Sequence, residues 1–133
     1  MKDKAELVQG WLRKAASDVV SMEATLQAGS LDGACFHAQQ AAEKYLKGYL
    51  SWHDRPFPHT HNLSDLIQSC AGIDATFSSL APAAAELTPY AVRLRYDDSF
   101  WPPHDVAAHA CESARTVRDF VLGRLPHDLV KSF

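Results

Sequence analysis

The sequence predicts an all-α fold, in which a single domain forms an up-and-down bundle of four to five helices. Its 133 residues are enough for one hydrophobic core but not for two. Apolar residues recur at steps of three and four through most of the chain, the period of an amphipathic helix. No segment alternates apolar and polar residues over any length, as a half-buried strand would. We expect the bundle to cover residues 1–126, followed by a short C-terminal tail at 127–133.

The first two predicted helices are the longest. One covers about residues 4–28 and ends at Gly29, which is placed as a C-cap glycine. The other covers about residues 31–53 and is apolar around so much of its circumference that we expect it to be the central helix. Its apolar side chains are Cys35, Phe36, Ala38, Ala42, Tyr45, Leu46, Tyr49, Leu50 and Trp52.

A proline-containing loop and a short third helix follow. Pro56 and Pro58 lie two residues apart, so this segment cannot be the interior of a helix. Asn62 is a suitable N-cap for a helix from Leu63 to about Ala71.

The rest of the chain predicts two more helical segments. Residues 74–92 form a fourth helix, interrupted or restarted at Pro82 and again at Pro89. An irregular stretch is expected at 95–103, before a last helix over about 104–124.

Composition limits the classes of function. The chain has 13 basic and 16 acidic residues, a net charge of −3, so any contact with phosphate must come from a local patch. No run approaches 18 apolar residues and the start is charged, which favours a cytoplasmic protein without membrane contact or secretory signal. The three cysteines lie far apart, as expected for buried thiols in a reducing compartment. No metal or cofactor is expected, since His59 and His61 supply only two of the ligands that zinc needs.

A polar stripe on the predicted central helix is the first candidate site. His37, Gln40, Lys44 and Lys47 follow each other at steps of three, four and three, so they share one side of the helix. One interpretation is a solvated face with a pair such as Glu43–Lys47 or Gln40–Lys44. The other is a site in which a histidine and two lysines meet an anion.

The second candidate site is a cluster of arginines and a tyrosine. If the backbone there is extended, Arg93 and Arg95 can face the same way and bind phosphate, and Tyr96 offers a ring on which a base can stack. Alternatively, Asp97 and Asp98 neutralise the two arginines.

Four segments of the chain resemble the HEPN (higher eukaryotes and prokaryotes nucleotide-binding) domain family. The most specific is residues 32–50, DGACFHAQQAAEKYLKGYL, which resembles the second helix of that family. Residues 59–66, HTHNLSDL, resemble the beginning of its next helix, and residues 87–96, LTPYAVRLRY, resemble its segment ending in Arg-Tyr-Pro. Residues 11–18 also fit its first helix, so that the resemblance runs from about residue 5 to 122.

The resemblance implies a helical bundle that is usually a homodimer. Such proteins are commonly encoded beside a minimal nucleotidyltransferase, as a two-component or toxin–antitoxin pair. Many HEPN proteins are metal-independent ribonucleases with an Arg-x4–6-His motif at the dimer interface. Others are nucleotide-binding modules.

The chain departs from the ribonuclease motif, so we do not expect it to be an enzyme. Eight residues separate Arg95 from His104, whereas Arg55 and His61 have five between them but lie in a different loop. A divergent ribonuclease using Arg95 with His104, or Arg55 with His61 across subunits, is therefore one alternative. A ligand-free dimeric interaction module is another.

The first expectation is a HEPN-type protein that binds a nucleotide or RNA and pairs with a nucleotidyltransferase. The residues expected to contact the nucleotide or its phosphates are Lys44, Lys47, Arg93, Arg95, Tyr96, His37 and Gln40.

Overall fold

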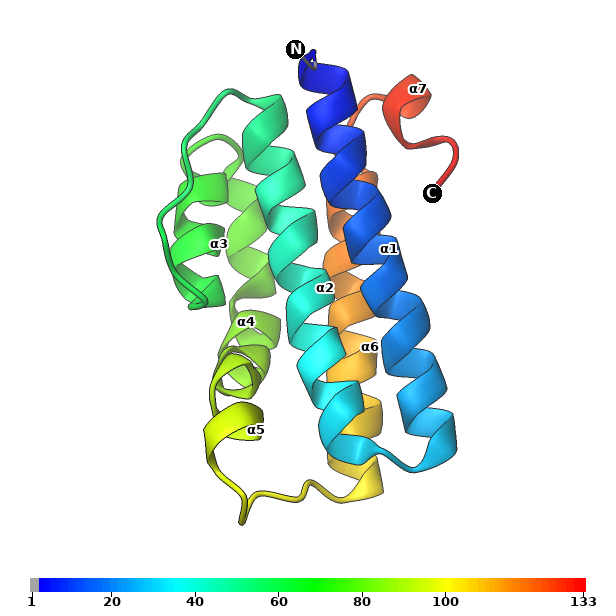
Figure 1. Cartoon of the computed structure of the whole chain (residues 1–133). Coiled ribbons are helices and arrows are strands. Elements are labelled where there is room, and N and C mark those ends of the chain that lie inside the picture. The colour runs from blue at the N-terminus through cyan, green and yellow to red at the C-terminus, as the bar shows by residue number, and fades with distance from the viewer. Residues whose placement is uncertain (1–2) are drawn as a thin grey trace.

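The computed structural model describes residues 3–133, apart from the side chains of residues 94 and 95. Every regular element in this part of the chain is a helix, which confirms the all-α, single-domain prediction. Helices α1 (Lys4–Ala28) and α2 (Leu31–Trp52) form a long antiparallel hairpin, and α6 (His104–Leu122) packs along it (Figure 1).

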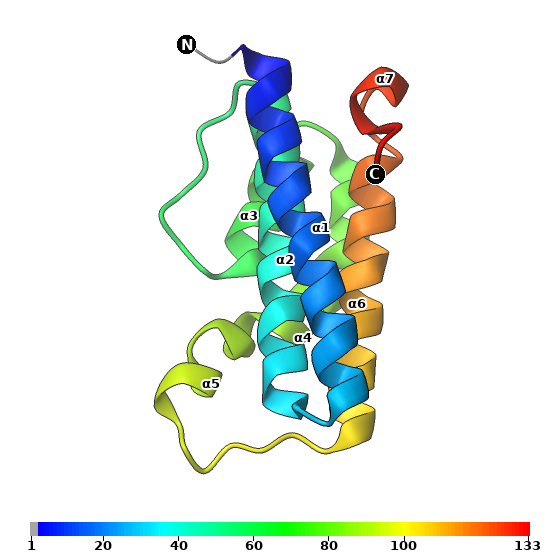
Figure 2. The same cartoon turned by 45° about the vertical axis from the view of Figure 1, so that its right-hand side comes forward.

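The shorter elements lie mainly on the other side of α2, so α2 is the central helix, as predicted. It contacts α1 and α6 as well as α3, α4, η2 and α5. Figures 1 and 2 show α3 beside the C-terminal half of α2 and α5 beside its N-terminal half. The bounds of these elements are α3 (Leu63–Ala71), η1 (Ala75–Leu80), α4 (Ala81–Leu87), η2 (Thr88–Ala91), α5 (Arg93–Tyr96) and α7 (His127–Val130).

Local capping explains why α1 begins and ends, and why α3 begins, close to the predicted bounds. The Asp3 side chain accepts a hydrogen bond from the Glu6 N–H at 2.8 Å, and Asn62 accepts one from the Ser64 N–H at 2.9 Å. Gly29 ends α1 with φ of 83°, a left-handed conformation that glycine adopts without a steric penalty.

The predicted fourth helix is broken in the two places that its prolines indicate. It consists of the 3-10 helix η1, the α-helix α4 and the 3-10 helix η2. Pro82 lies in the first turn of α4 and Pro89 in the first turn of η2. Because a first turn needs no N–H donor at that position, each proline begins a new element.

Two segments are more ordered than expected. Arg93–Tyr96 forms a helical turn, α5, closed by hydrogen bonds from Tyr96 N to Val92 O (3.3 Å) and from Asp97 N to Arg93 O (2.9 Å). The expected tail contains α7, in which Leu129 is buried and its carbonyl accepts a hydrogen bond from Gln9 of α1. Burial of one leucine therefore ties the end of the chain to the first helix.

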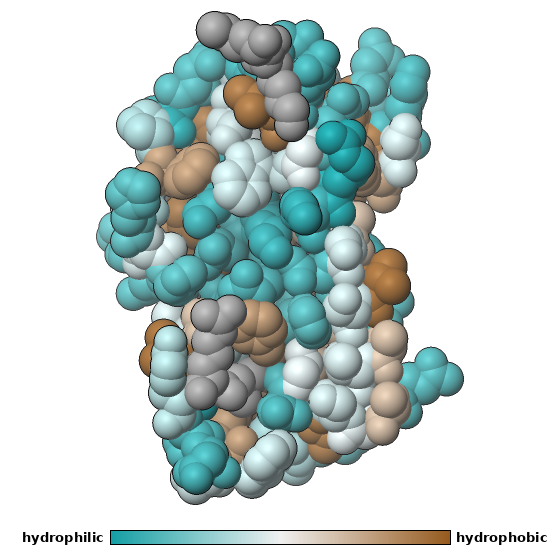
Figure 3. Space-filling model, viewed as in Figure 1, coloured by the Kyte–Doolittle hydropathy of each residue, from teal (hydrophilic) through white to brown (hydrophobic). Residues whose placement is uncertain are grey.

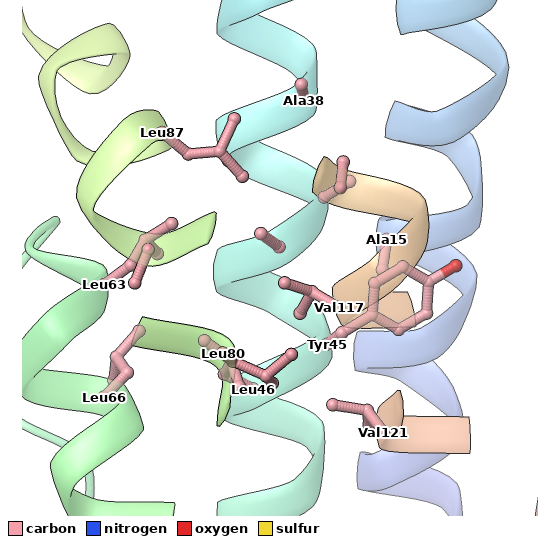
Figure 4. Packing of buried hydrophobic residues seen from close by; sticks show 14 of the residues in the cluster. Ala15, Ala38, Tyr45, Leu46, Leu63, Leu66, Leu80, Leu87, Val117 and Val121 are labelled. Atoms are coloured by element: carbon pink, nitrogen blue, oxygen red, sulfur yellow. The ribbon is translucent and has the colours of Figure 1, made fainter. Parts of the chain in front are cut away.

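The core lies on both sides of α2. Figure 4 shows Leu46 pointing toward Leu80 on one side, and Tyr45 beside Val117 of α6 on the other. Cys35, Cys70 and Cys111 are free and buried, and burial raises the pKa of the Cys35 and Cys70 thiols to about 12. As predicted, these thiols pack in the core. No helix between residues 3 and 133 has the length and apolar character needed to cross a bilayer.

Candidate functional site

A polar face formed by α1 and α2 carries the first predicted site. Figure 3 shows hydrophilic residues gathered across the middle of this side of the molecule. Two buried acidic side chains lie at the centre of this face. Asp18 of α1 is 8% exposed and Glu43 of α2 is 4% exposed. Carboxylates buried to this degree need partners, and each has both a lysine and a histidine.

Asp18 binds two of the predicted phosphate-contacting residues. Its Oδ1 atom lies 3.0 Å from Nδ1 of His37, and its Oδ2 atom forms an ion pair with the Lys44 ammonium. The side chains of His37 and Lys44 remain 30% and 22% exposed, so both still reach solvent. We call Asp18, His37 and Lys44 the Asp18 cluster.

Glu43 organises a second cluster, the Glu43 cluster, with Lys47 and His61. Its carboxylate lies 3.1 Å from Nζ of Lys47 and 3.0 Å from Nδ1 of His61, and it accepts a hydrogen bond from Gln39 at 3.1 Å. The Lys47 ammonium also lies 5.6 Å from the Trp11 ring and 5.4 Å from the Phe57 ring. The side chain of this lysine is only 15% exposed, so it packs against the two rings as well as pairing with Glu43.

The residues of the predicted stripe therefore belong to two separate hydrogen-bonded groups: His37 and Lys44 bind Asp18, whereas Gln40 and Lys47 are linked to Glu43. Gln40 donates to Gln39 at 2.6 Å, and Gln39 donates to Glu43. Of the two pairs that the sequence suggested, Glu43–Lys47 forms, while Lys44 turns to Asp18 on the neighbouring helix. The lysines on this face are paired with carboxylates, so it is not a simple solvated surface.

Hydrogen bonding to Glu43 leads to a pH dependence of stability. Burial raises the pKa of Glu43, but hydrogen bonds from His61, Gln39 and Lys47 outweigh burial and bring it below its ordinary value of 4.5. A carboxyl whose pKa is lowered on folding stabilises the folded state above its unfolded pKa and loses that contribution as the pH falls through the folded one. We expect the free energy of unfolding of the wild type to fall below pH 4.5 more steeply than that of Glu43→Gln. Denaturant titrations at a series of pH values test this, and parallel curves would contradict it.

The second predicted site is the exposed segment around α5. The Arg93 guanidinium carbon lies 4.1 Å from the centre of the Phe100 ring, which stacks in turn on Tyr90 at 6.1 Å. Tyr90 is buried, so this column anchors Arg93 to the core. Tyr96 is 79% exposed.

The backbone around the two arginines is a helical turn. The extended backbone that was the condition for Arg93 and Arg95 to face the same way is therefore not present. The Arg95 side chain lies outside the described residues. The Asp97 carboxylate binds the Ser99 N–H and hydroxyl, and these hydrogen bonds, with a smaller contribution from the nearby Arg93 charge, lower the pKa of Asp97. Among the described residues, no carboxylate forms an ion pair with Arg93.

His104 lies away from α5. It begins α6 and lines a hollow of about 580 Å³ at the C-terminal end of α1, together with Glu23 and Arg115. Figures 1 and 2 show the chain after α5 passing beneath the N-terminal end of α2 to reach it.

Arg55 and His61 are not brought together within one chain. Nη1 of Arg55 lies against Gly72, 3.4 Å from where a Cβ atom there would be, whereas His61 binds Glu43. Gly72 follows α3 and His61 precedes it, so this nine-residue helix of roughly 13 Å separates the two contacts.

Asp18 is the main residue of the polar face that was not predicted as part of a site. It lies three residues after Ala15 and four before Met22, so it shares the apolar side of α1. A single acidic residue on the apolar side of a helix needs a partner from a neighbouring helix, and this was the signal in the sequence that could have identified Asp18.

Fold and site together define an all-α domain built on a long helical hairpin with a polar network between its helices. The HEPN domain family model matches residues 8–125, and the chain belongs to the HEPN family. It is also similar to a solved structure described as the crystal structure of TT1696 from Thermus thermophilus. The two share 26% sequence identity with a TM-score of 0.75, over 89% of this chain and 98% of that one. No match was found among curated proteins.

Proposed function

We propose that this HEPN protein binds a nucleotide or a short RNA segment between α5 and the polar face of α1 and α2. The observation that carries the proposal is that α5 presents both Arg93, which stacks on Phe100 and has no ion-paired carboxylate among the described residues, and the exposed ring of Tyr96. A guanidinium suits phosphate, and an exposed aromatic ring suits a base. α5 packs against α2, whose N-terminal half carries His37 and Gln40.

The contributions of the candidate residues differ in this proposal. Lys44 and Lys47 each have a carboxylate partner, so they add little net charge to the site. Arg93 therefore provides the main phosphate contact and Tyr96 the main stacking contact. Arg95, His37 and Gln40 remain candidates for the same ligand.

Binding of a fluorescently labelled tetrauridylate, followed by anisotropy, tests the proposal. We expect Arg93→Ala and Tyr96→Ala each to weaken binding about tenfold, the size of one phosphate contact or one stacked base. Arg93→Ala should also make binding less dependent on salt, because fewer counterions are released.

Arg13→Ala removes an exposed arginine from α1 and serves as the matched control. If both α5 variants bind as tightly at low salt as the wild type and the Arg13 variant, this segment is not the binding site.

The family resemblance also implies two partners, a second copy of the chain and a nucleotidyltransferase, and we include both in the proposal. We propose a homodimer that pairs with a minimal nucleotidyltransferase. Light scattering of the purified chain is expected to give twice the chain mass, and co-expression with the neighbouring reading frame is expected to give a stable complex. A monomer that co-purifies with nothing would contradict this part.

A further inference from the structure

Trp101, in the loop between α5 and α6 (Figure 2), is a large exposed side chain that the proposed function does not use. It is 70% exposed, although Phe100 before it packs against the core and Pro102 after it is buried. Because both neighbours are anchored, the backbone holds Trp101 in place while its ring faces solvent. A ring of this size in contact with water is unfavourable, so a bound molecule that covers it gains stability.

Arg93 is placed near two exposed rings, those of Tyr96 and Trp101. Tyr96 follows Arg93 by three residues in the helical turn α5, so the two side chains share one side of that turn. The Arg93 guanidinium also stacks on Phe100, the residue directly before Trp101. Between the two rings the chain makes a turn, closed by a hydrogen bond of 3.2 Å from Phe100 N to Asp97 O. The end Cα atoms of such a turn lie within about 7 Å, so those of Tyr96 and Trp101 are at most about 15 Å apart.

The charges of this segment suit a single phosphate. The Arg93 guanidinium can bind one phosphate diester through paired hydrogen bonds. Over residues 93–98 two arginines and two aspartates cancel in formal charge, so the segment as a whole does not attract a long polyanion. Asp97 and Asp98 belong to the turn between the rings and disfavour a second phosphate there. The arrangement therefore accommodates two bases and the one phosphate that links them.

We infer that the proposed site binds a dinucleoside monophosphate unit of single-stranded RNA, with one base on Tyr96, the other on Trp101 and the linking phosphate on Arg93. This inference rests on the proposed nucleotide-binding function and adds Trp101 as its second stacking residue. Every base has a face that can stack, so the unit is recognised by its size and charge rather than by its sequence. A double helix does not fit, since its bases are already stacked on each other.

Two ligands of equal charge test the inference, uridylyl-uridine and the methyl ester of uridine monophosphate. Each has one phosphodiester, but only uridylyl-uridine has a second base. We expect the wild type to bind uridylyl-uridine about tenfold more tightly than the methyl ester, the size of one stacked base.

The variants at Trp101 separate stacking from a structural role. Trp101→Ala should weaken binding of uridylyl-uridine about tenfold and binding of the methyl ester less than about twofold, because a single base can stack on Tyr96 instead. A structural role would weaken both ligands alike. Trp101→Phe keeps a ring, so its affinity for uridylyl-uridine should stay within about threefold of the wild type.

Tryptophan fluorescence provides a direct readout of the same contact. Trp52→Phe is the matched control, because Trp52 is the last residue of α2 and lies 4.6 Å from the Lys4 ammonium, away from α5. Uridylyl-uridine should quench the emission of the wild type and of Trp52→Phe, but not that of Trp101→Phe.

The inference alone is overturned if Trp101→Ala keeps the wild-type preference for uridylyl-uridine, or if the wild type has no preference while Arg93→Ala still weakens binding. It is also overturned if Trp101→Ala weakens both ligands alike. Loss of a dimer in light scattering would then identify Trp101 as a contact between copies of the chain. A wild type that binds neither ligand would reject the proposed function as well.

Discussion

Replacing Glu43 with alanine is expected to lower the free energy of unfolding by about 3 kcal/mol or more, as is typical when one partner of a buried ion pair is removed. Glu43 is 4% exposed and accepts hydrogen bonds from α2 itself and from the loop before α3. Without it, the Lys47 ammonium keeps its aromatic neighbours but loses its counterion. Urea denaturation at neutral pH measures the effect.

An exposed acid on α6 provides the comparison. Glu112 pairs with Arg115 at 3.2 Å, but its side chain is 69% exposed, so Glu112→Ala should cost less than about 1 kcal/mol. Equal losses for the two variants would show that burial does not govern the contribution of these carboxylates.

Replacing Phe77 with alanine is expected to cost about 3–5 kcal/mol, the range for removing a fully buried phenylalanine. The Phe77 ring is 0% exposed and lies 4.5 Å from the Tyr49 ring and 4.9 Å from the Phe120 ring, measured between centroids. It therefore joins η1 to both α2 and α6, and through η1 it supports the elements that lead to α5.

Phe133 is a suitable control for Phe77. It is 36% exposed at the end of the chain, and its removal should change stability by less than about 0.5 kcal/mol. A loss below about 1 kcal/mol for Phe77→Ala would mean that η1 packs against the bundle more loosely than the structure indicates.

The sequence predicted those features that depend on neighbours along the chain. Gly29 and Asn62 are at the helix ends where their capping preferences place them, and Pro82 and Pro89 begin new elements. The Glu43–Lys47 pair could also be predicted, because residues four apart on a helix are neighbours.

Contacts between residues that are distant in the sequence could not be predicted in the same way. Lys44 and Asp18 are 26 residues apart, and their ion pair depends on how α1 packs against α2. The interpretation of the stripe as an anion site assumed two available lysines, whereas both are neutralised by carboxylates. Similarly, the spacing of Arg93 and Phe100 did not indicate that a helical turn would bring the guanidinium onto the ring.

An NMR titration of the ¹⁵N-labelled protein with tetrauridylate tests the central claim, that the ligand lies between α5 and the polar face. We expect the largest amide shifts in residues 92–101, with further shifts at Asp18 and His37. Shifts concentrated around Glu23 and Arg115, at the hollow beside His104, or no shifts at saturating ligand, would contradict it.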